Sequence, residues 1–269
     1  MPTVLLLTNI IQWEGRGSPP LLNSIEEKIK SAINQRGAIH MTLLDPQKIG
    51  PERSARIATE AEKAGTFSIM VGGSTLASRN DLDDGVKKIK NQVNVPVILF
   101  PNDIAGVSKY ADAIWFMSLL NSRVTYYVID AQAMSAYTVK SYGLEAIPLG
   151  YIIIGPGGTV GYIGQARGIP YDRPELATAY ALASQMLGMR FVYLEAGSGA
   201  QAPVPKDMIK MVKSQLSVPL IVGGGIRTGK AAKDVVEAGA DIIVTGNLVE
   251  ETGKVRESIN EIVSAIEDR

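Results

Sequence analysis

The sequence predicts an α/β fold, a closed (β/α)8 barrel with an extra N-terminal helix, and three observations indicate it. The chain has 269 residues, near the roughly 250 that such a barrel needs. Short β-branched apolar runs alternate with longer amphipathic runs in eight successive units. The apolar runs are continuous, as in parallel strands that are covered on both faces. We therefore expect a single TIM-barrel domain over residues 1–269.

The expected elements alternate regularly along the chain. A helix over Leu21–Arg36 comes first, and several later helices end at glycine, as helix C-termini tend to. The expected strands are Ala38–Leu44, Phe67–Val71, Val97–Phe100, Ala113–Met117, Ala146–Ile154, Phe191–Glu195, Pro219–Val222 and Asp241–Thr245. The helices expected between them include Pro51–Ala64, Asp81–Asn91, Pro174–Leu187, Lys206–Ser214 and Gly229–Ala238.

The region around the third βα unit departs from this regularity. A regular unit has a full helix after each strand. Residues Pro101–Tyr110 are too few for one, and Gly143–Gly168 is long and rich in glycine. We expect irregular structure in both stretches.

Composition and charge exclude several classes of function. The 27 basic and 27 acidic residues cancel, so nucleic-acid binding has no electrostatic support. The absence of cysteine excludes disulfides and thiolate zinc sites and fits a cytoplasmic protein. The one histidine, His40, rules out His-pair metal sites and is expected to pack in the barrel. No run approaches the roughly 20 apolar residues that span a bilayer, so no integral membrane segment is expected.

Glycine-rich turns follow the last two expected strands. Strand seven runs into Gly223–Thr228, and strand eight runs into Gly246 and Asn247. Glycines let backbone N–H groups approach an anion, and the loops after these two barrel strands often hold a phosphate. Tight turns also need glycine. Two such turns one unit apart nevertheless favour phosphate binding.

A third glycine-rich turn follows strand six, in Tyr193–Gly199, and adds a carboxylate to the same rim. Glu195 ends a strand where barrels keep their catalytic groups, so a functional role is favoured over a surface carboxylate. Tyr193 is equally compatible with a role in the site and with filling the barrel interior.

A candidate metal site lies at the ends of strands one and two. Asp45 follows the first strand and Ser74 follows the second. A carboxylate, a hydroxyl, water and substrate oxygens suit Mg²⁺. Alternatively, Asp45 caps a turn and Ser74 caps the next helix. One or two basic residues on this face could meet a diphosphate, although a solvated charge on a helix surface is favoured for any single one. The candidates are Arg79, Lys48, Arg123, Arg167 and Arg227.

Six segments occur in a specific order: LLDP, VGGST, FMSLLNS, YLEAGSG, VGGGIRT and TGN. Together they resemble the geranylgeranylglyceryl phosphate synthase family, whose bacterial relatives are heptaprenylglyceryl phosphate synthases. The resemblance covers nearly the whole chain and fits the larger of the family's two groups, which implies a homo-oligomer, a dimer or a hexamer. It implies transfer of a geranylgeranyl group from geranylgeranyl diphosphate to the 3-hydroxyl of sn-glycerol 1-phosphate, with release of diphosphate, in archaeal membrane lipid biosynthesis.

The resemblance also implies roles for individual residues. Asp45 and Ser74 would hold Mg²⁺, and Glu195 would engage the accepting hydroxyl as the catalytic residue. The family's first loop usually has a second acid where this chain has Gln47, and we expect Asp45 to be the ligand that counts. The residues implied to bind sn-glycerol 1-phosphate are Tyr193, Leu194, Glu195, Ala196, Gly197, Ser198, Gly199, Gly224, Gly225, Gly246 and Asn247.

The length of the prenyl chain stays open, with a heptaprenyl donor as the alternative within the family. Either chain requires an apolar channel, and core packing is the alternative role for at least half of its candidate residues. The candidate lining residues are Ile114, Phe116, Met117, Tyr126, Tyr137 and Tyr142.

A phosphate-binding barrel isomerase is the alternative outside the family. Such an enzyme needs an acid–base pair across the barrel, so Asp45 would require a second acid such as Asp130 or Asp241. We expect Asp130 inside a helix and Asp241 at the wrong end of its strand, which disfavours this alternative.

Overall fold

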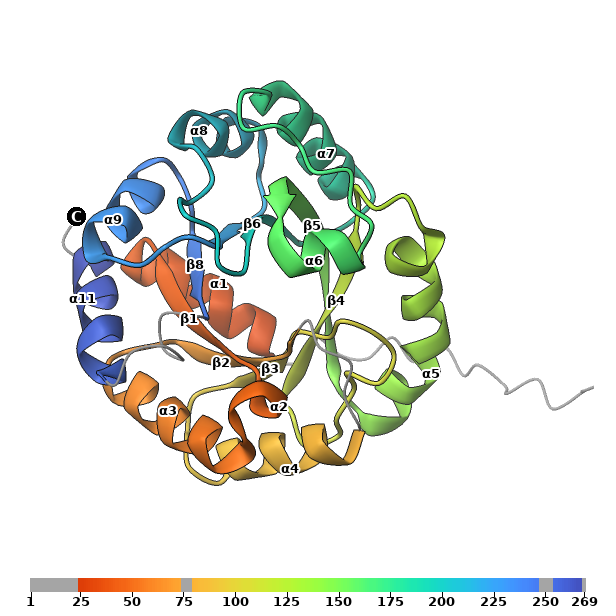
Figure 1. Cartoon of the computed structure of the whole chain (residues 1–269), viewed down its shortest axis with the longest axis vertical. Coiled ribbons are helices and arrows are strands. Elements are labelled where there is room, and N and C mark those ends of the chain that lie inside the picture. The colour runs from red at the N-terminus through yellow and green to blue at the C-terminus, as the bar shows by residue number, and fades with distance from the viewer. Residues whose placement is uncertain (1–23, 74–78, 247–253, 268–269) are drawn as a thin grey trace, which may run out of the picture.

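The structure, a computed structural model, describes residues 24–73, 79–246 and 254–267. Eight parallel strands close into a barrel in sequence order, and β8 pairs back with β1. Figure 1 looks down this barrel and shows the helices arranged around it. The predicted (β/α)8 barrel is confirmed.

Three strands are longer than predicted. β4, β5 and β6 continue past their expected C-terminal ends. The ladder between β4 and β5 reaches the pair Leu119 and Tyr151. The ladder between β5 and β6 resumes after a register shift, at the pair Gly157 and Gly197. The strands are β1 (Ile39–Leu44), β2 (Ser68–Val71), β3 (Val97–Leu99), β4 (Ala113–Leu119), β5 (Glu145–Gly157), β6 (Phe191–Gly197), β7 (Leu220–Gly223) and β8 (Ile242–Thr245).

The predicted helices are present with small shifts at their ends. The first begins at Ile25 rather than at Leu21, since the Ser24 hydroxyl caps it by accepting the Glu27 N–H (3.1 Å). Residues 21–23 lie outside the described residues. The helices are α1 (Ile25–Arg36), α2 (Pro46–Ile49), α3 (Pro51–Lys63), α4 (Arg79–Lys90), α5 (Ala131–Tyr142), α6 (Gly158–Ile163), α7 (Pro174–Met186), α8 (Lys206–Gln215), α9 (Gly229–Glu237) and α11 (Val255–Glu267).

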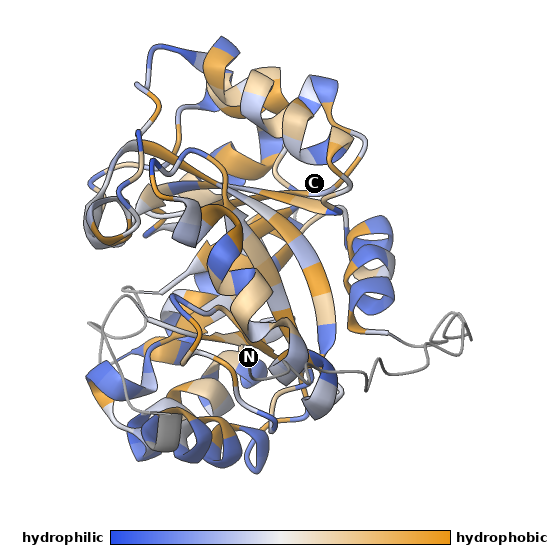
Figure 2. Ribbon diagram, turned by 90° about the vertical axis from the view of Figure 1, so that its right-hand side faces the viewer, coloured by the Kyte–Doolittle hydropathy of each residue, from blue (hydrophilic) through white to orange (hydrophobic). Residues whose placement is uncertain are grey.

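Apolar side chains fill the barrel interior and the layer between barrel and helices. Inside the barrel, the rings of Trp115 and Phe191 meet edge to face with centroids 5.1 Å apart, and both residues are fully buried. Figure 2 shows mostly hydrophobic strands and helices that carry hydrophilic residues on part of their surface. In the part of the chain that the structure describes, no helix is long and apolar enough to cross a bilayer.

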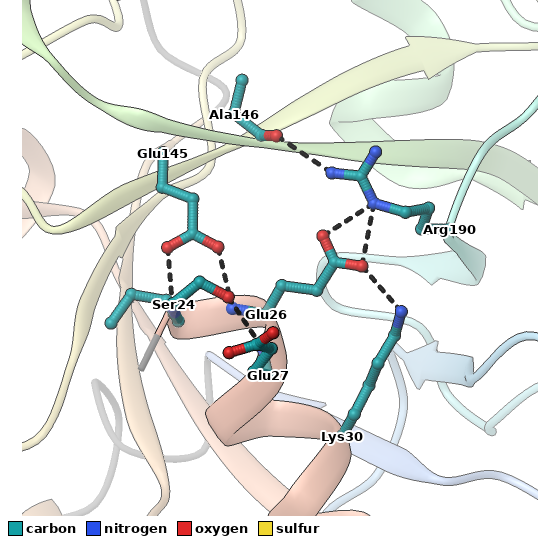
Figure 3. A network of polar contacts seen from close by, with 8 residues as sticks. Ser24, Glu26, Glu27, Lys30, Glu145, Ala146 and Arg190 are labelled. Atoms are coloured by element: carbon teal, nitrogen blue, oxygen red, sulfur yellow. Dashed lines mark hydrogen bonds and ion pairs between the residues drawn. The ribbon is translucent and has the colours of Figure 1, made fainter. Parts of the chain in front are cut away.

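Helix α1 closes one end of the barrel. Glu145, the first residue of β5, accepts the backbone N–H groups of Ile25 (2.6 Å) and Glu26 (2.9 Å). Glu26 in turn accepts from Arg190 Nε (2.7 Å) and Lys30 Nζ (2.7 Å) (Figure 3). Because Glu145 and Arg190 stand where β5 and β6 begin, α1 covers the N-terminal end of the barrel. The opposite end is left for a site.

The irregular structure predicted for Pro101–Tyr110 is present, whereas the same prediction for Gly143–Gly168 is wrong over most of its length, because β5 (Glu145–Gly157) and α6 (Gly158–Ile163) occupy it. Residues 100–112 connect β3 to β4 by turns and bends without a helix. A π-helical turn, Tyr126–Asp130, precedes α5, and β5 passes directly into α6 through Gly157 at φ +67°. Such π-helical turns often occur at functional sites.

Candidate active site

A cavity of about 400 Å³ opens at the C-terminal ends of the barrel strands. Glycine turns and polar side chains line it on the side of β6, β7 and β8. Apolar side chains from β4, the π-helical turn and α5 line it on the other side. The cavity therefore offers one region to a polar ligand and another to an apolar one.

Glu195 lies at the boundary between the two regions. Its side chain is 6% exposed, and its Oε1 accepts the Gly197 N–H at 2.6 Å. Burial raises the pKa of Glu195, while hydrogen bonds from Gly197 N–H and the hydroxyls of Tyr193 and Tyr151 oppose the rise. A buried carboxylate with a raised pKa is suited to accept a proton from a substrate hydroxyl.

Tyr151 is a member of this site that the sequence analysis missed. It sits on β5 directly beside Tyr193 on β6, with ring centroids 5.1 Å apart. Burial, followed by the nearby Glu195 charge, raises the pKa of both phenols well above the usual value. Both tyrosines therefore stay protonated and can donate to the carboxylate. Tyr193 thus fills the barrel interior and also contacts Glu195.

The glycine turns pack so closely that side chains would not fit. Gly224 has φ +83°, and a Cβ there would lie 2.7 Å from both Glu195 Oε1 and Gly197 N. Gly225 has φ +72° and faces the backbone of Ala202 in the same way. Helix α9 begins shortly after these turns, at Gly229, and protein acceptors cap its N-terminus: the Gly229 N–H donates to Glu261 Oε1 (2.7 Å) and the Ala231 N–H donates to the Thr228 hydroxyl (3.2 Å).

The predicted glycerol phosphate residues divide into three groups. Leu194 and Ala196 point away from the cavity into the core between barrel and helices, because side chains alternate along a strand. Asn247 lies outside the described residues. The predicted residues that line the cavity are Tyr193, Glu195, Gly197, Ser198, Gly199, Gly224, Gly225 and Gly246.

Asp45 lines the cavity at the end of β1. Its Oδ1 caps α2 by accepting the N–H groups of Gln47 (3.1 Å) and Lys48 (3.2 Å), as the capping alternative predicted. Its Oδ2 abuts the turn after β2, where a Cβ on Gly73 would be 1.9 Å away. Ser74, the predicted partner, lies outside the described residues. Among the residues described, no three His, Asp or Glu side chains cluster as metal ligands, so substrate and water would complete any shell around Asp45.

Three of the six predicted channel residues line the apolar region, namely Ile114, Phe116 and Met117. Of the three tyrosines, Tyr137 is 79% exposed and Tyr142 packs against the outer core. Neither these two nor Tyr126 is among the lining residues. The tyrosine of the π-helical turn that does line the cavity is Tyr127.

The basic residues predicted to meet a diphosphate differ in whether they line the cavity. Lys48 and Arg227 line the cavity, whereas Arg123 and Arg167 do not. The side chain of Arg79 lies outside the described residues. His40 is buried between Thr66 and Thr245, as the expectation of a packed histidine predicted.

Comparison with known proteins adds sequence and fold relatives. The model of the PcrB family matches residues 30–266. The geranylgeranylglyceryl phosphate synthase of Pyrococcus abyssi is 53% identical over 237 residues, covering 88% of this chain and 94% of that protein. That of Thermofilum pendens is 52% identical over 241 residues, covering 90% and 94%.

A solved structure is similar over the same length. The crystal structure of (S)-3-O-geranylgeranylglyceryl phosphate synthase from Thermoplasma acidophilum, in complex with its substrate sn-glycerol-1-phosphate, has a TM-score of 0.89 and 43% identity, covering 92% of this chain and 100% of that one. These matches identify the chain as a member of the PcrB family, related to the geranylgeranylglyceryl phosphate synthases.

Proposed function

We propose that this protein is a prenyltransferase that joins geranylgeranyl diphosphate to the 3-hydroxyl of sn-glycerol 1-phosphate and releases diphosphate. The observation that carries the proposal is the position of Glu195, a buried carboxylate between glycine turns and an apolar cavity wall. The names of the relatives point to the same reaction.

The glycine turns suit the phosphate of sn-glycerol 1-phosphate. Gly224 and Gly225 have positive φ angles, and Gly246 directly follows the neighbouring strand β8. Backbone N–H groups at such turns hold an anion without a charged side chain. A phosphate there would direct the glycerol hydroxyls towards Glu195.

The reaction replaces one carbon–oxygen bond with another. The bond between the allylic carbon and the diphosphate oxygen breaks, and the glycerol 3-hydroxyl oxygen bonds to that carbon. The hydroxyl proton passes to Glu195, whose carboxylate orients the hydroxyl before the transfer. The hydroxyls of Tyr151 and Tyr193 keep the carboxylate in place and favour its ionised form.

Asp45, with Ser74, is the proposed Mg²⁺ site. A single carboxylate beside a substrate cavity is the kind of donor set that Mg²⁺ uses when phosphate oxygens and water supply the other ligands. The ion would neutralise charge on the departing diphosphate. Lys48 also lines this part of the cavity and offers a further positive charge.

The apolar region accounts for the other substrate. Ile114, Phe116 and Tyr127 provide a wall that can bury a prenyl chain, and each buried methylene contributes about 0.8 kcal/mol. The heptaprenyl alternative differs only in the length of chain that this region accepts. Donors of different length distinguish the two.

The two acids named for the isomerase alternative lie away from the cavity. Asp241 lies where β8 begins and binds Lys213 (2.5 Å), and Asp130 accepts from Thr125 (2.9 Å). Neither carboxylate lines the cavity. A pair of Asp45 with Asp130 or with Asp241 therefore has no support.

The homo-oligomer, a dimer or a hexamer, and the cytoplasmic location are part of the same proposal. Three apolar residues of helix α5 and the turn before it are largely exposed: Ile129 is 58%, Met134 is 60% and Tyr137 is 79% exposed. Exposed apolar residues that gather on one element are typical of subunit contacts. Light scattering on the purified protein measures the state directly.

Diphosphate release by the purified protein tests the activity. The assay supplies sn-glycerol 1-phosphate and Mg²⁺ with geranylgeranyl, farnesyl or heptaprenyl diphosphate. We expect preferred turnover of the C20 donor, dependence on the glycerol phosphate, and loss of turnover with EDTA. Absence of turnover with every donor would contradict the proposal, and preferred turnover of the C35 donor would favour the heptaprenyl alternative.

A further inference from the structure

A buried polar network joins β1 to the end of β8. His40 Nε2 lies 2.9 Å from the Thr245 hydroxyl, and His40 Nδ1 lies 3.0 Å from the Thr66 hydroxyl. The Thr42 hydroxyl donates to the same Thr66 oxygen at 3.1 Å. His40 is 1% exposed, and none of the three threonines is more than 3% exposed. The chemistry proposed for Glu195 uses none of these groups.

The partners determine which ring nitrogen carries the proton. The Thr66 hydroxyl has carbonyl acceptors in reach, His40 O at 3.2 Å and Ser68 O at 3.4 Å. Its hydrogen is used there, so its oxygen accepts from Thr42 and from His40 Nδ1–H. His40 Nε2 is then the bare nitrogen and accepts the hydroxyl hydrogen of Thr245. Burial lowers the pKa of His40 to about 3, so the ring remains neutral and keeps this pattern.

Thr245 is the last residue of β8, and His40, which accepts its hydrogen bond, lies on the neighbouring strand β1. The ladder between β1 and β8 ends at the pair Thr42 and Thr245, and Gly246 follows beyond the ladder. Both Thr245 and Gly246 line the cavity. A side-chain hydrogen bond to His40 therefore fixes the chain at the point where the ladder stops, one residue before Gly246.

We propose that His40 is a positioning residue, which acts through the Thr245 hydroxyl to hold Gly246 in the place where it lines the binding site for the phosphate of sn-glycerol 1-phosphate. This inference rests on the proposed function for the identity of the ligand. It assigns His40 an effect on phosphate affinity and none on the transfer step, since His40 does not line the cavity.

Two valine variants test the inference. Thr245→Val removes the hydroxyl that His40 accepts from, and Thr42→Val removes an equally buried hydroxyl of the same network that does not touch the ring. Isothermal titration with sn-glycerol 1-phosphate alone should show about tenfold weaker binding for Thr245→Val, the size expected for one buried hydrogen bond. Thr42→Val should bind within twofold of the unchanged protein. At saturating glycerol phosphate, kcat should stay within twofold for both.

Two histidine variants extend the test. Gln can place its Oε1 where Nε2 stands and accept from Thr245, whereas Asn can replace only Nδ1. His40→Gln should therefore retain most of the affinity that His40→Asn loses. Thermal melting checks that each variant is folded.

The inference is overturned if Thr245→Val binds sn-glycerol 1-phosphate as well as the unchanged protein. It is equally overturned if Thr245→Val and Thr42→Val lose the same affinity, since the network would then act only through general stability. If the unchanged protein forms no ether product but Thr245→Val still weakens glycerol phosphate binding, the inference stands and the proposed function fails.

Discussion

Two sides of the barrel, the side of β6–β8 and the side of β3–β5, line the same cavity with different chemical groups. On the first, regular units end in glycine turns that offer backbone N–H groups, with Gly224 against Glu195. On the second, the regular pattern breaks, and a π-helical turn and α5 leave an apolar wall. Regular units make a polar site of fixed shape, and the interrupted unit makes room for a long apolar chain. Glu195 lies where the two meet.

The largest effect should come from the group at this boundary. Glu195→Gln keeps the size of the side chain and the hydrogen bond to Gly197 but removes the base. We expect kcat to fall about 10²- to 10⁴-fold, the usual contribution of a general base. Steady-state assays measure it, and binding of each substrate should remain. A rate within threefold of the unchanged protein would remove Glu195 from the chemistry.

The glycine side should respond next. Gly224→Ala places a methyl group 2.7 Å from Glu195 Oε1 at a φ of +83°, with a strain of about 1–3 kcal/mol. We expect roughly ten- to hundredfold weaker binding of sn-glycerol 1-phosphate in titration calorimetry. Gly143→Ala is the control, because it has φ +67° but nothing within 4 Å. It should lower stability and leave the affinity unchanged; equal affinities for both variants would contradict the role of the turn.

The apolar side should respond separately. Ala131 lines the cavity from the first turn of α5, whereas Ala133 on the same helix is exposed. Ala131→Phe should raise KM for geranylgeranyl diphosphate about tenfold, because the ring takes space from the prenyl chain. Binding of glycerol phosphate should not change. The matched variant Ala133→Phe should behave like the unchanged protein. A loss of glycerol phosphate affinity in Ala131→Phe would contradict the assignment of the two substrates to separate regions of the cavity.

A smaller effect is expected on the pH profile. Glu195 must be ionised to accept a proton, and burial raises its pKa above 4.5. The value of kcat/KM should therefore fall as the pH falls through this raised pKa. Tyr151→Phe removes a hydrogen bond that lowers the pKa, so this limb should move to higher pH. The control Tyr162→Phe alters an 86% exposed tyrosine and should leave the limb in place. A shift to lower pH in Tyr151→Phe would contradict the assignment.

The closed end of the barrel should affect stability alone. Glu145→Ala removes two hydrogen bonds at the start of α1 and should lower the free energy of unfolding by about 1–3 kcal/mol, as measured in urea. Glu175→Ala, an exposed acid in the first turn of α7, should cost less. Neither variant should alter glycerol phosphate affinity, and a change in Glu145→Ala would link the two ends of the barrel.

The same contrast explains what the sequence could predict. Gly224, Gly225 and Glu195 were predictable because the end of a barrel strand is recognisable from its apolar run. Leu194 and Ala196 also lie in that segment, yet their side chains point into the core between barrel and helices, because side chains alternate along a strand. Tyr151 was missed because β5 is a continuous apolar run, in which no pattern marks the residue that faces inward.

The channel was harder to predict for a different reason. Ile114, Phe116 and Met117 lie on an extended strand, and they line the cavity as expected. Tyr126 lies in the π-helical turn, whose wider turn changes which side chains face inward. Tyr137 lies on the exposed side of the α-helix that follows. The tyrosines were predicted only from their nearness to the irregular region, and nearness in sequence does not tell which side chains face the cavity.

In the proposed reaction, Glu195 accepts the hydroxyl proton of the glycerol phosphate, which the glycine turns bind, while the apolar wall binds the prenyl donor. Product analysis by mass spectrometry, with sn-glycerol 1-phosphate, geranylgeranyl diphosphate and Mg²⁺, tests it most directly. The unchanged protein should form the C20 ether, and Glu195→Gln should bind both substrates and form almost none. Ether formation by Glu195→Gln at the unchanged rate, or none by the unchanged protein, would contradict the claim.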